Sequence, residues 1–277
     1  MGLWMSNVEY LSDAGHLPAA GARVLDIGSQ NLYFATPEAI RRFVLRHGHI
    51  ADEAAFATEA ERIAYFSTPR PGERTAYVSE LFDLTPAIHY TSFDVCPALK
   101  TEILDLNLES CPEAYRGTFD VVLNFGTTEH IIDQVNCYRV MHDALGVGGV
   151  AVHQVPSVGW LGHGYFSYQP PFFDDLVRAN GYRLIDRWFT RWQTTPLAAD
   201  IDIRDPWTPA VRASGEQEPV GPAPREVPNY NLNVVYAKEI DQPFRIGLEL
   251  ATSHAQLSEA VAARYLGGAR AVGDPVR

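Results

Sequence analysis

Short apolar runs alternate with stretches of helical periodicity along most of the chain. The runs lie at residues 23–27, 89–95, 102–107, 118–126, 150–155, 182–190 and 231–237. Apolar residues three or four apart mark the stretches between them, at residues 37–47, 52–66, 74–84, 135–145 and 170–180. Runs that are apolar on both faces are typical of buried parallel strands. Strands that alternate with helices predict the α/β class, with a doubly wound sheet.

The interval between the first two predicted strands is unusually long. Asp26 closes the first strand, Asp94 closes the second, and three predicted helices lie between them. Connections in α/β units are short, so one helix crosses between the strands and the others form an insertion at about residues 37–88. An insertion at the carboxyl edge of a sheet commonly covers the substrate. We therefore expect a helical cap here, with plain helical padding as the alternative.

The second half of the chain adds a long loop and a tail. Residues 205–229 contain six prolines, too many for regular structure, which predicts a loop or lid. Apolar residues at rough helical spacing over residues 247–266 predict a terminal helix that packs on the body of the protein or on a second subunit. A second copy of the chain, forming a homodimer, is therefore one expected partner. The predicted domain spans residues 18–240, and the helical tail spans residues 241–277.

Acidic residues close the first three predicted strands. They are Asp26, Asp94 and Asp105, and Asp26 is followed after one residue by Gly28. Ligands of open α/β sheets bind outside the carboxyl ends of the strands. An ionised carboxylate only accepts hydrogen bonds, so it suits a vicinal diol, which offers two donors. Each acid alone could belong to a turn or cap a helix, but three in succession indicate a binding site.

Two segments, VLDIGSQN at residues 24–31 and FDVVLNFGTTEHI at residues 119–131, carry a family resemblance. Together with LGVGGVAVHQVP, which follows, they resemble the small-molecule type of class I S-adenosylmethionine-dependent methyltransferase. That family has an acid, one residue and a glycine after its first strand, a Glu-His pair after its fourth, and a Gly-Gly turn before its fifth. The resemblance implies a Rossmann-like sheet of seven strands, mostly parallel with the last strand antiparallel.

The resemblance also implies the cofactor, S-adenosyl-L-methionine, and its contacts. Asp94 is expected to accept hydrogen bonds from the ribose hydroxyls, and Asp105 from the adenine amino group. The predicted cofactor-binding residues are Asp26, Gly28, Ser29, Gln30, Asn31, Asp94, Val95, Asp105, Leu106 and Asn124. The first loop departs from the family because Gly28 is its only glycine. The same departure disfavours a dinucleotide site, which needs Gly-x-Gly-x-x-Gly.

Histidines gather near the carboxyl ends of the fourth and fifth predicted strands. An unperturbed imidazole has a pKa of about 6.5 and so serves well as a general base near neutral pH. His130 follows the fourth strand, and His163 lies between glycines in the loop after the fifth. We predict that His130, His163 and Glu129 are catalytic and that His153, within a strand, belongs to the core.

The loop after the fifth strand is rich in aromatic residues and spaced by glycines. We predict that Trp160, Tyr165 and Tyr168 bind the substrate, and that Phe172 and Phe173 belong to the core. The expected pocket is bounded by Asn124, His130, Trp160, His163 and Tyr165, with part of the insertion as its roof.

A metal ion is not expected from the sequence. Glu129, His130 and Asp133 offer suitable ligand types, but their spacing at the start of a helix does not bring all three side chains together. The three cysteines are widely spaced, which indicates reduced structural thiols and not a metal site.

Charge and hydropathy narrow the classes of partner. The formal net charge is −12, which opposes binding to nucleic acid but suits a cationic cofactor. Neither a leader pattern nor an apolar run of membrane-spanning length is visible, so we expect a cytoplasmic protein without a membrane partner.

The leading hypothesis is therefore methyl transfer to a small-molecule acceptor. Oxygen is the first choice of acceptor atom, as in a sugar or a natural-product intermediate, followed by nitrogen and then carbon. One alternative keeps the fold and the cofactor but transfers no methyl group, as in a scaffold or a pericyclase-like protein. A second alternative is an NAD-dependent reductase.

Overall fold

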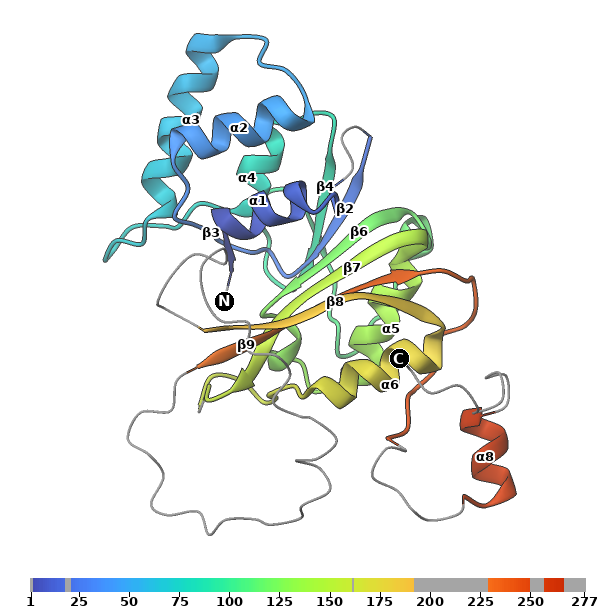
Figure 1. The fold of residues 1–277 in the computed structure, drawn as a ribbon. Helices are drawn as coiled ribbons and strands as arrows, with labels where there is room; N and C mark the ends of the chain where they lie inside the picture. The colour runs from blue at the N-terminus through green and yellow to red at the C-terminus, as the bar shows by residue number, and fades with distance from the viewer. Residues whose placement is uncertain (1, 18–20, 161, 192–228, 250–256, 267–277) are drawn as a thin grey trace.

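A seven-stranded sheet runs through the centre of the computed structural model (Figure 1). Its strands lie in the order β5-β4-β2-β6-β7-β9-β8, and β9 alone runs antiparallel to its neighbours. The predicted fold class is confirmed, including the antiparallel last strand. The strands are β2 (Arg23–Ile27), β4 (His89–Asp94), β5 (Thr101–Ile103), β6 (Phe119–Phe125), β7 (Leu145–Val158), β8 (Tyr182–Arg191) and β9 (Tyr230–Lys238).

The structure describes residues 2–17, 21–160, 162–191, 229–249 and 257–266. The predicted Pro-rich loop thus lies outside the described residues except at its last position, Asn229. Within the described residues, every helix is too short or too polar to cross a membrane.

The strand order reverses at β2. From β2 the chain continues to β4 and β5 on one side, and it returns to β6 and β7 on the other. Asp26 therefore lies opposite Ser92 of β4 and Leu123 of β6. In open α/β sheets, this reversal opens a crevice at the carboxyl ends of the strands. The topology places that crevice between the loops that follow β2 and β6.

Helices cover both faces of the sheet (Figure 1). On one face, α1 (Met5–Asp13), α2 (Pro37–His47), α3 (Glu53–Ser67) and α4 (Val78–Asp83) share a core with Val24, Val121 and Leu123. On the other face, α5 (Gln134–Ala144) and α6 (Pro170–Asn180) pack with residues such as Leu25 and Val122. The alternating directions of strand side chains divide the core in this way. A further helix, α8 (Glu259–Leu266), comes after β9 in the sequence.

The predicted insertion corresponds to α2, α3 and α4. The apolar sides of these helices belong to the first core, and residues 76–78 run beside the loop after β2, where Leu32 N donates to Ala76 O at 2.7 Å. The predicted domain start at residue 18 leaves out α1, although Val8 and Leu11 are fully buried in the same core. Closure of the insertion over a substrate stays a prediction.

Several element boundaries differ from the predictions. The strand predicted at residues 102–107 ends at Ile103, because Asp105 accepts from Asn107 N at 2.8 Å and closes a turn. The fifth predicted strand does not stop at Pro156, since β7 continues to Val158 through a shift in its pairing with β9. Residues 247–249 are not helical.

Three elements of the N-terminal half were not predicted as they occur. The helix predicted at residues 74–84 begins only at Val78, since Tyr77 pairs with Asn31 instead. Helix α1 was not predicted. Neither was the two-stranded parallel ribbon of β1 (Leu3–Trp4) and β3 (Leu32–Tyr33).

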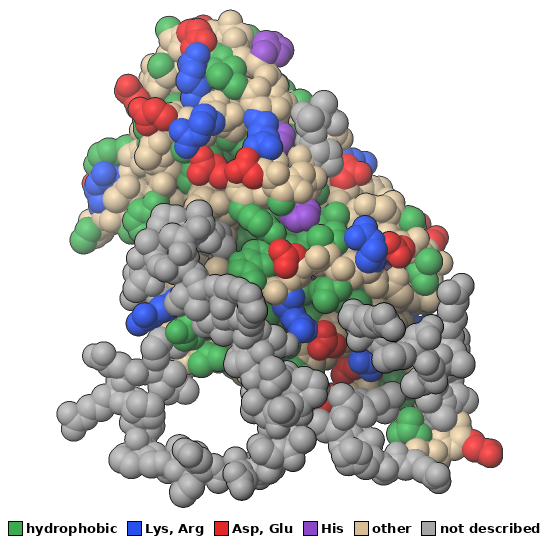
Figure 2. All heavy atoms as spheres, viewed as in Figure 1, with side chains coloured by type: hydrophobic (Ala, Val, Ile, Leu, Met, Phe, Trp, Pro, Cys, Tyr) green, Lys and Arg blue, Asp and Glu red, His purple; other side chains and the backbone are tan. Residues whose placement is uncertain are grey.

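Charged side chains of both signs lie together over α1, α2 and α3 (Figure 2). Arg41 pairs with Glu53, Arg42 with Glu9, and Arg46 with Asp13. These pairs join α2 to its two neighbouring helices. Glu9, Asp13 and Glu53 are therefore each paired with an arginine of α2.

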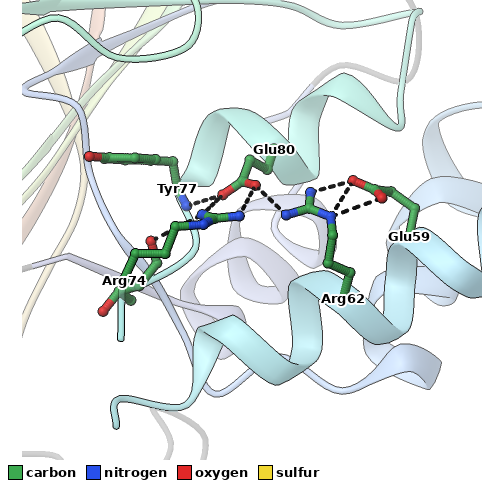
Figure 3. A network of polar contacts seen from close by, with 6 residues as sticks. Glu59, Arg62, Arg74, Tyr77 and Glu80 are labelled. Atoms are coloured by element: carbon green, nitrogen blue, oxygen red, sulfur yellow. Dashed lines mark hydrogen bonds and ion pairs between the residues drawn. The ribbon is translucent and has the colours of Figure 1, made fainter. Parts of the chain in front are cut away.

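A second charged network joins α3 to the start of α4 (Figure 3). Glu80 accepts from Arg62 Nη1 at 2.7 Å, from Arg74 Nη1 at 2.8 Å and from Tyr77 N at 2.7 Å. Its side chain is only 11% exposed, whereas Glu59, at the far end of the network, is 38% exposed. Burial alone would raise the pKa of Glu80, but these hydrogen bonds outweigh it and lower the pKa from 4.5 to about 2.

Replacing Glu80 with glutamine should lower the free energy of unfolding by about 2 kcal/mol near neutral pH. Because the folded pKa is depressed, the stability that this carboxylate contributes is present above its unfolded pKa. It is lost as the pH falls from 4.5 to about 2, so the variant should show a flatter pH profile there. Urea denaturation across this pH range measures both effects. Glu59→Gln is the matched control and should cost at most about 1 kcal/mol; equal losses would contradict this account.

Candidate functional site

The loop after β2 turns at Gly28 and packs directly on the loop after β6. Gly28 has a φ of +89°, which favours glycine, and its N–H donates to Phe93 O at 2.8 Å. A Cβ atom at this position would lie 2.4 Å from Thr127 Oγ1. The absence of a side chain at Gly28 thus allows the loops after β2 and β6 to make contact.

Gln30 fastens the same two loops together. Its side-chain amide donates to Ile27 O at 3.1 Å and to Thr127 Oγ1 at 2.6 Å, and the residue is 5% exposed. Gln30 therefore anchors the loop after β2 to the loop after β6.

Asp94 connects the glycine loop to the end of β4. Its Oδ2 accepts from Ser29 N at 2.7 Å, and its Oδ1 accepts from Cys96 N at 2.9 Å. Ser29 Oγ also lies 3.1 Å from Ser92 Oγ and 2.8 Å from Thr101 Oγ1. An ionised carboxylate accepts about four hydrogen bonds, so Asp94 retains capacity for two further donors.

Asp26 and Asn124 are fully buried polar residues, and each lies one residue before the end of its strand, β2 or β6. Asp26 Oδ2 accepts from Tyr90 Oη at 2.7 Å, and Asn124 Nδ2 donates to Thr128 Oγ1 at 3.0 Å and to His153 Nδ1 at 3.1 Å. Among the described residues, Asp26 Oδ1 and Asn124 Oδ1 have no hydrogen-bond partner. Unpaired buried polar atoms are costly, so each of these oxygens is a separate candidate for a polar ligand. Asp26 lies on the face covered by α1 to α4, and Asn124 lies on the face covered by α5 and α6.

The pKa of Asp26 responds to this environment. Burial raises it well above its usual value, the hydrogen bond from Tyr90 opposes that effect, and the charge of Asp94 adds to it. The carboxyl group thus favours its neutral form until a cationic group lies beside it.

The remaining predicted cofactor-binding residues differ in their exposure and in the groups that they contact. Asn31 continues the loop and pairs with Tyr77, and Val95 follows Asp94 with 61% of its surface exposed. Asp105 lies in the turn after β5, whereas Leu106 is 3% exposed and belongs to the second core. Leu106 therefore contributes packing to this region.

The three predicted catalytic side chains lie together. His163 Nε2 is 3.4 Å from Glu129 Oε1, and His130 Nε2 is 3.8 Å from the same oxygen. The centroids of the two imidazole rings are 5.0 Å apart. We call Glu129, His130 and His163 the Glu-His-His cluster.

Backbone contacts bring the two parts of the cluster together. Glu129 and His130 belong to a short 3-10 helix, η2 (Thr128–His130), after β6. Glu129 O accepts from Tyr165 N at 2.8 Å and from Phe166 N at 3.3 Å, which holds the loop after β7 against η2. A Cβ atom on Gly164 would lie 2.9 Å from Glu129, so glycine permits this approach.

Burial shifts the titration of all three cluster residues. It raises the pKa of Glu129 to about 7 and lowers the pKa of His130 and of His163. Each shift favours the neutral form of its group, as expected for ionisable groups removed from water.

The three predicted substrate-binding aromatics separate into two groups. Trp160 lies against His163, with ring centroids 4.8 Å apart, and its indole N–H donates to Tyr230 O at 3.0 Å. Tyr165 is 68% exposed in the same loop. Tyr168 is instead buried in the second core, where its hydroxyl donates to Gln134 Oε1 at 2.6 Å. Its aromatic ring serves packing, so the expectation that it faces substrate is not met.

The other aromatic expectations are met in part. Phe173 is 1% exposed and His153 is fully buried, as predicted for core residues. Phe172 is 37% exposed. It lines a pocket of about 340 Å³ between α5, α6 and residues 244–249, together with residues such as Tyr138 and Phe244. That pocket contains none of the predicted site residues.

Sequence reasoning missed two residues of the site, Thr127 and Tyr90. Thr127 receives the Gln30 amide, and Tyr90 donates to Asp26. Tyr90 lies two residues before Ser92, the register partner of Asp26, and therefore on the same face of the sheet. The period-two pattern of β4 would have indicated it only if the register had been known.

No protein-family model and no curated protein matches the chain. Solved structures similar to it include an S-adenosylmethionine-dependent methyltransferase from Mesorhizobium loti. The two sequences are 15% identical, the TM-score is 0.35, and the match covers 83% of this chain and 97% of that chain. A putative methyltransferase from Bacillus halodurans has 9% identity, coverage of 85% and 100%, and a TM-score of 0.45. The [4+2]-cyclase SpnF has 12% identity, coverage of 85% and 81%, and a TM-score of 0.41. Similarity at these identities and TM-scores concerns the fold alone.

Replacing Gln30 with alanine should lower the free energy of unfolding by about 1–3 kcal/mol, because one buried and one partly buried hydrogen bond are lost. Urea denaturation followed by circular dichroism measures the change. Gln169→Ala is the matched control, because Gln169 is exposed and makes no side-chain cap at α6; it should cost less than about 0.5 kcal/mol. A Gln30 variant as stable as this control would show that the loop has another anchor.

Proposed function

We propose that the protein transfers a methyl group from S-adenosyl-L-methionine to a small-molecule acceptor, with oxygen as the first choice of acceptor atom. The observation that carries the proposal is the contact between Asp94 and Ser29 N at 2.7 Å. It joins the acid at the end of β4 to the glycine turn after β2. Both lie at the crevice where an open α/β sheet binds its ligand.

The polar groups at this edge fit the cofactor. Asp94 retains acceptor capacity for the two ribose hydroxyls, and Asp105 lies in the next turn as the candidate for the adenine amino group. Asp26 Oδ1 is buried without a partner among the described residues and would be ionised by a cationic group of the ligand. When bound, the cofactor supplies a methyl group on a positively charged sulfur.

Gln30 is the departure from the motif that bears on this fit. Its side chain turns under the loop toward Ile27 O and Thr127, so it completes the packing between strands β2 and β6. The backbone turns at Gly28 with a positive φ of +89°. In this proposal the loop contacts the cofactor through its backbone.

The Glu-His-His cluster and Trp160 form the acceptor end of the proposed site. Methyl transfer is an in-line displacement, and a hydroxyl acceptor must lose its proton during the reaction. The cluster offers one carboxyl and two imidazoles that accept a proton or polarise an O–H bond. Trp160 and Tyr165 supply aromatic surface beside it.

The proposal includes a role in small-molecule biosynthesis in the cytoplasm. A net charge of −12 opposes a nucleic acid acceptor. The alternative in which the cofactor is bound but not consumed draws on the atypical loop at residues 28–32, which has Gly28 as its only glycine, and on the absence of a decisive general base.

Asp94→Ala should weaken binding of S-adenosylmethionine by about 1.5–3 kcal/mol, or roughly 10-fold to 150-fold in Kd, because a charged acceptor is lost. Isothermal titration calorimetry with the cofactor and its demethylated product measures this change. Asp120→Ala is the matched control. Asp120 also accepts from a backbone N–H, that of Arg23 at 2.8 Å, but at the opposite ends of the strands.

Ligand binding to the wild-type protein tests the proposal itself. If neither ligand binds at high micromolar concentration, the methyltransferase assignment fails. If both bind equally to the wild type and to Asp94→Ala, the role of Asp94 is wrong. Mass spectrometry of a panel of hydroxyl and amine acceptors then separates the alternatives, because one methylated product excludes a protein that only holds the cofactor.

A further inference from the structure

We propose that Glu129, His130 and His163 bind a divalent transition-metal ion. The ligand atoms of these three side chains all lie within 4.8 Å of one another. At metal–ligand distances of about 2.1 Å, ligands in a tetrahedral site are roughly 3.4 Å apart. The 3.4 Å between His163 Nε2 and Glu129 Oε1 matches that spacing, and the 3.8 Å to His130 Nε2 needs only a small closure.

The state of Glu129 is a separate observation that indicates a cation. Its side chain is fully buried, and neither carboxyl oxygen has a hydrogen-bond partner outside its own residue among the described residues. Burying an unsatisfied carboxyl group is costly. His163 Nε2 is likewise without a partner there. A cation between the three side chains would satisfy Glu129 Oε1 and His163 Nε2 at once.

The backbone arranges the ligands before any ion binds. Glu129 and His130 are consecutive in η2, and the hydrogen bonds from Tyr165 N and Phe166 N to Glu129 O fix the loop that carries His163. Gly164 leaves space for the approach. Preformed ligands bind an ion without a large cost in conformational entropy.

The ligand types favour a particular class of ion. Two imidazoles and one carboxylate suit zinc, cobalt, iron or nickel, whereas magnesium and calcium prefer sites made of oxygen ligands. Three protein ligands leave at least one coordination position open, as in catalytic zinc sites. His130 and His163 are 44% and 27% exposed, so that position is accessible from outside.

This site differs from the set of Glu129, His130 and Asp133, whose spacing disfavours a metal site. Asp133 is turned toward α5, where its Oδ1 accepts from Asn136 N at 2.8 Å. The third ligand comes from the loop after β7, more than thirty residues further along the chain. Asp133 is therefore kept from the cluster by its place at the start of α5, whereas His163 reaches Glu129 from a separate loop.

Titration of the metal-free protein with Co²⁺ and Zn²⁺ tests the proposal without any cofactor or acceptor. The wild type should bind one equivalent of Co²⁺ with visible d–d absorption, and Zn²⁺ should displace it. Glu129→Gln and His163→Gln should each weaken binding by on the order of tenfold or more, by analogy with the losses seen when the support of a ligand is removed. Both ions should raise the Tm of the wild type but not of these variants.

His89→Gln is the matched control, since His89 is an exposed histidine outside the cluster; it should bind like the wild type. Circular dichroism verifies that each variant folds, and His163→Gln, on a partly exposed loop, keeps the test informative if Glu129→Gln does not. The proposal fails if the wild type binds no ion, or if both cluster variants bind as well as His89→Gln. A thiolate–cobalt band that persists in them would place the ion at the exposed Cys96 and would also overturn it.

Discussion

The contact between the loops after β2 and β6 is the constraint on which the rest of the site depends. Gly28 lacks a side chain where one would collide with Thr127, and the Gln30 amide bridges the remaining distance. These two features hold the ends of neighbouring strands together at the point where the strand order reverses. The glycine turn consequently has a fixed position relative to Asp94 on one side and Asn124 on the other.

Two carboxyl groups near this edge of the sheet are buried. Asp26 and Glu129 lie in protein interior, and each has at least one oxygen that the described residues leave unpaired. Removing a carboxylate from water is costly unless a cation or a set of donors compensates. A chain whose acidic residues exceed its basic ones by twelve thus keeps two of them where burial favours their neutral forms.

Local pattern predicted the elements well where the signal was complete within one element. Helix α2 begins at Pro37 after Thr36, whose hydroxyl accepts from Ala39 N, and both residues are standard start signals. Helix α6 ends at Gly181 in the left-handed conformation, again as the glycine indicates. Strand β7 shows the limit, since the pairing that carries it past Pro156 joins Val158 to Tyr230, which lies far along the chain.

The same distinction applies to the candidate site. Asp94 and the cluster residues could be predicted because each stands at the end of a strand or in the loop that follows. The roles of Gln30, Tyr90 and Tyr168 could not, because each depends on a partner chosen by register or packing: Thr127, Asp26 and Gln134. A single sequence shows that a residue is polar or aromatic, but it does not show which side chain it will meet.

The position of β9 has a consequence for how the chain reaches its fold. This strand lies between β7 and β8, although it follows both in the sequence, and Gln154 meets Asn233 across 79 residues. Until β9 has been synthesised, β7 presents an unpaired edge and β8 has no neighbour in the sheet. Unpaired edges attract other chains, and distant pairings form slowly. Synthesis of the last strand thus converts two exposed edges into the interior of one sheet.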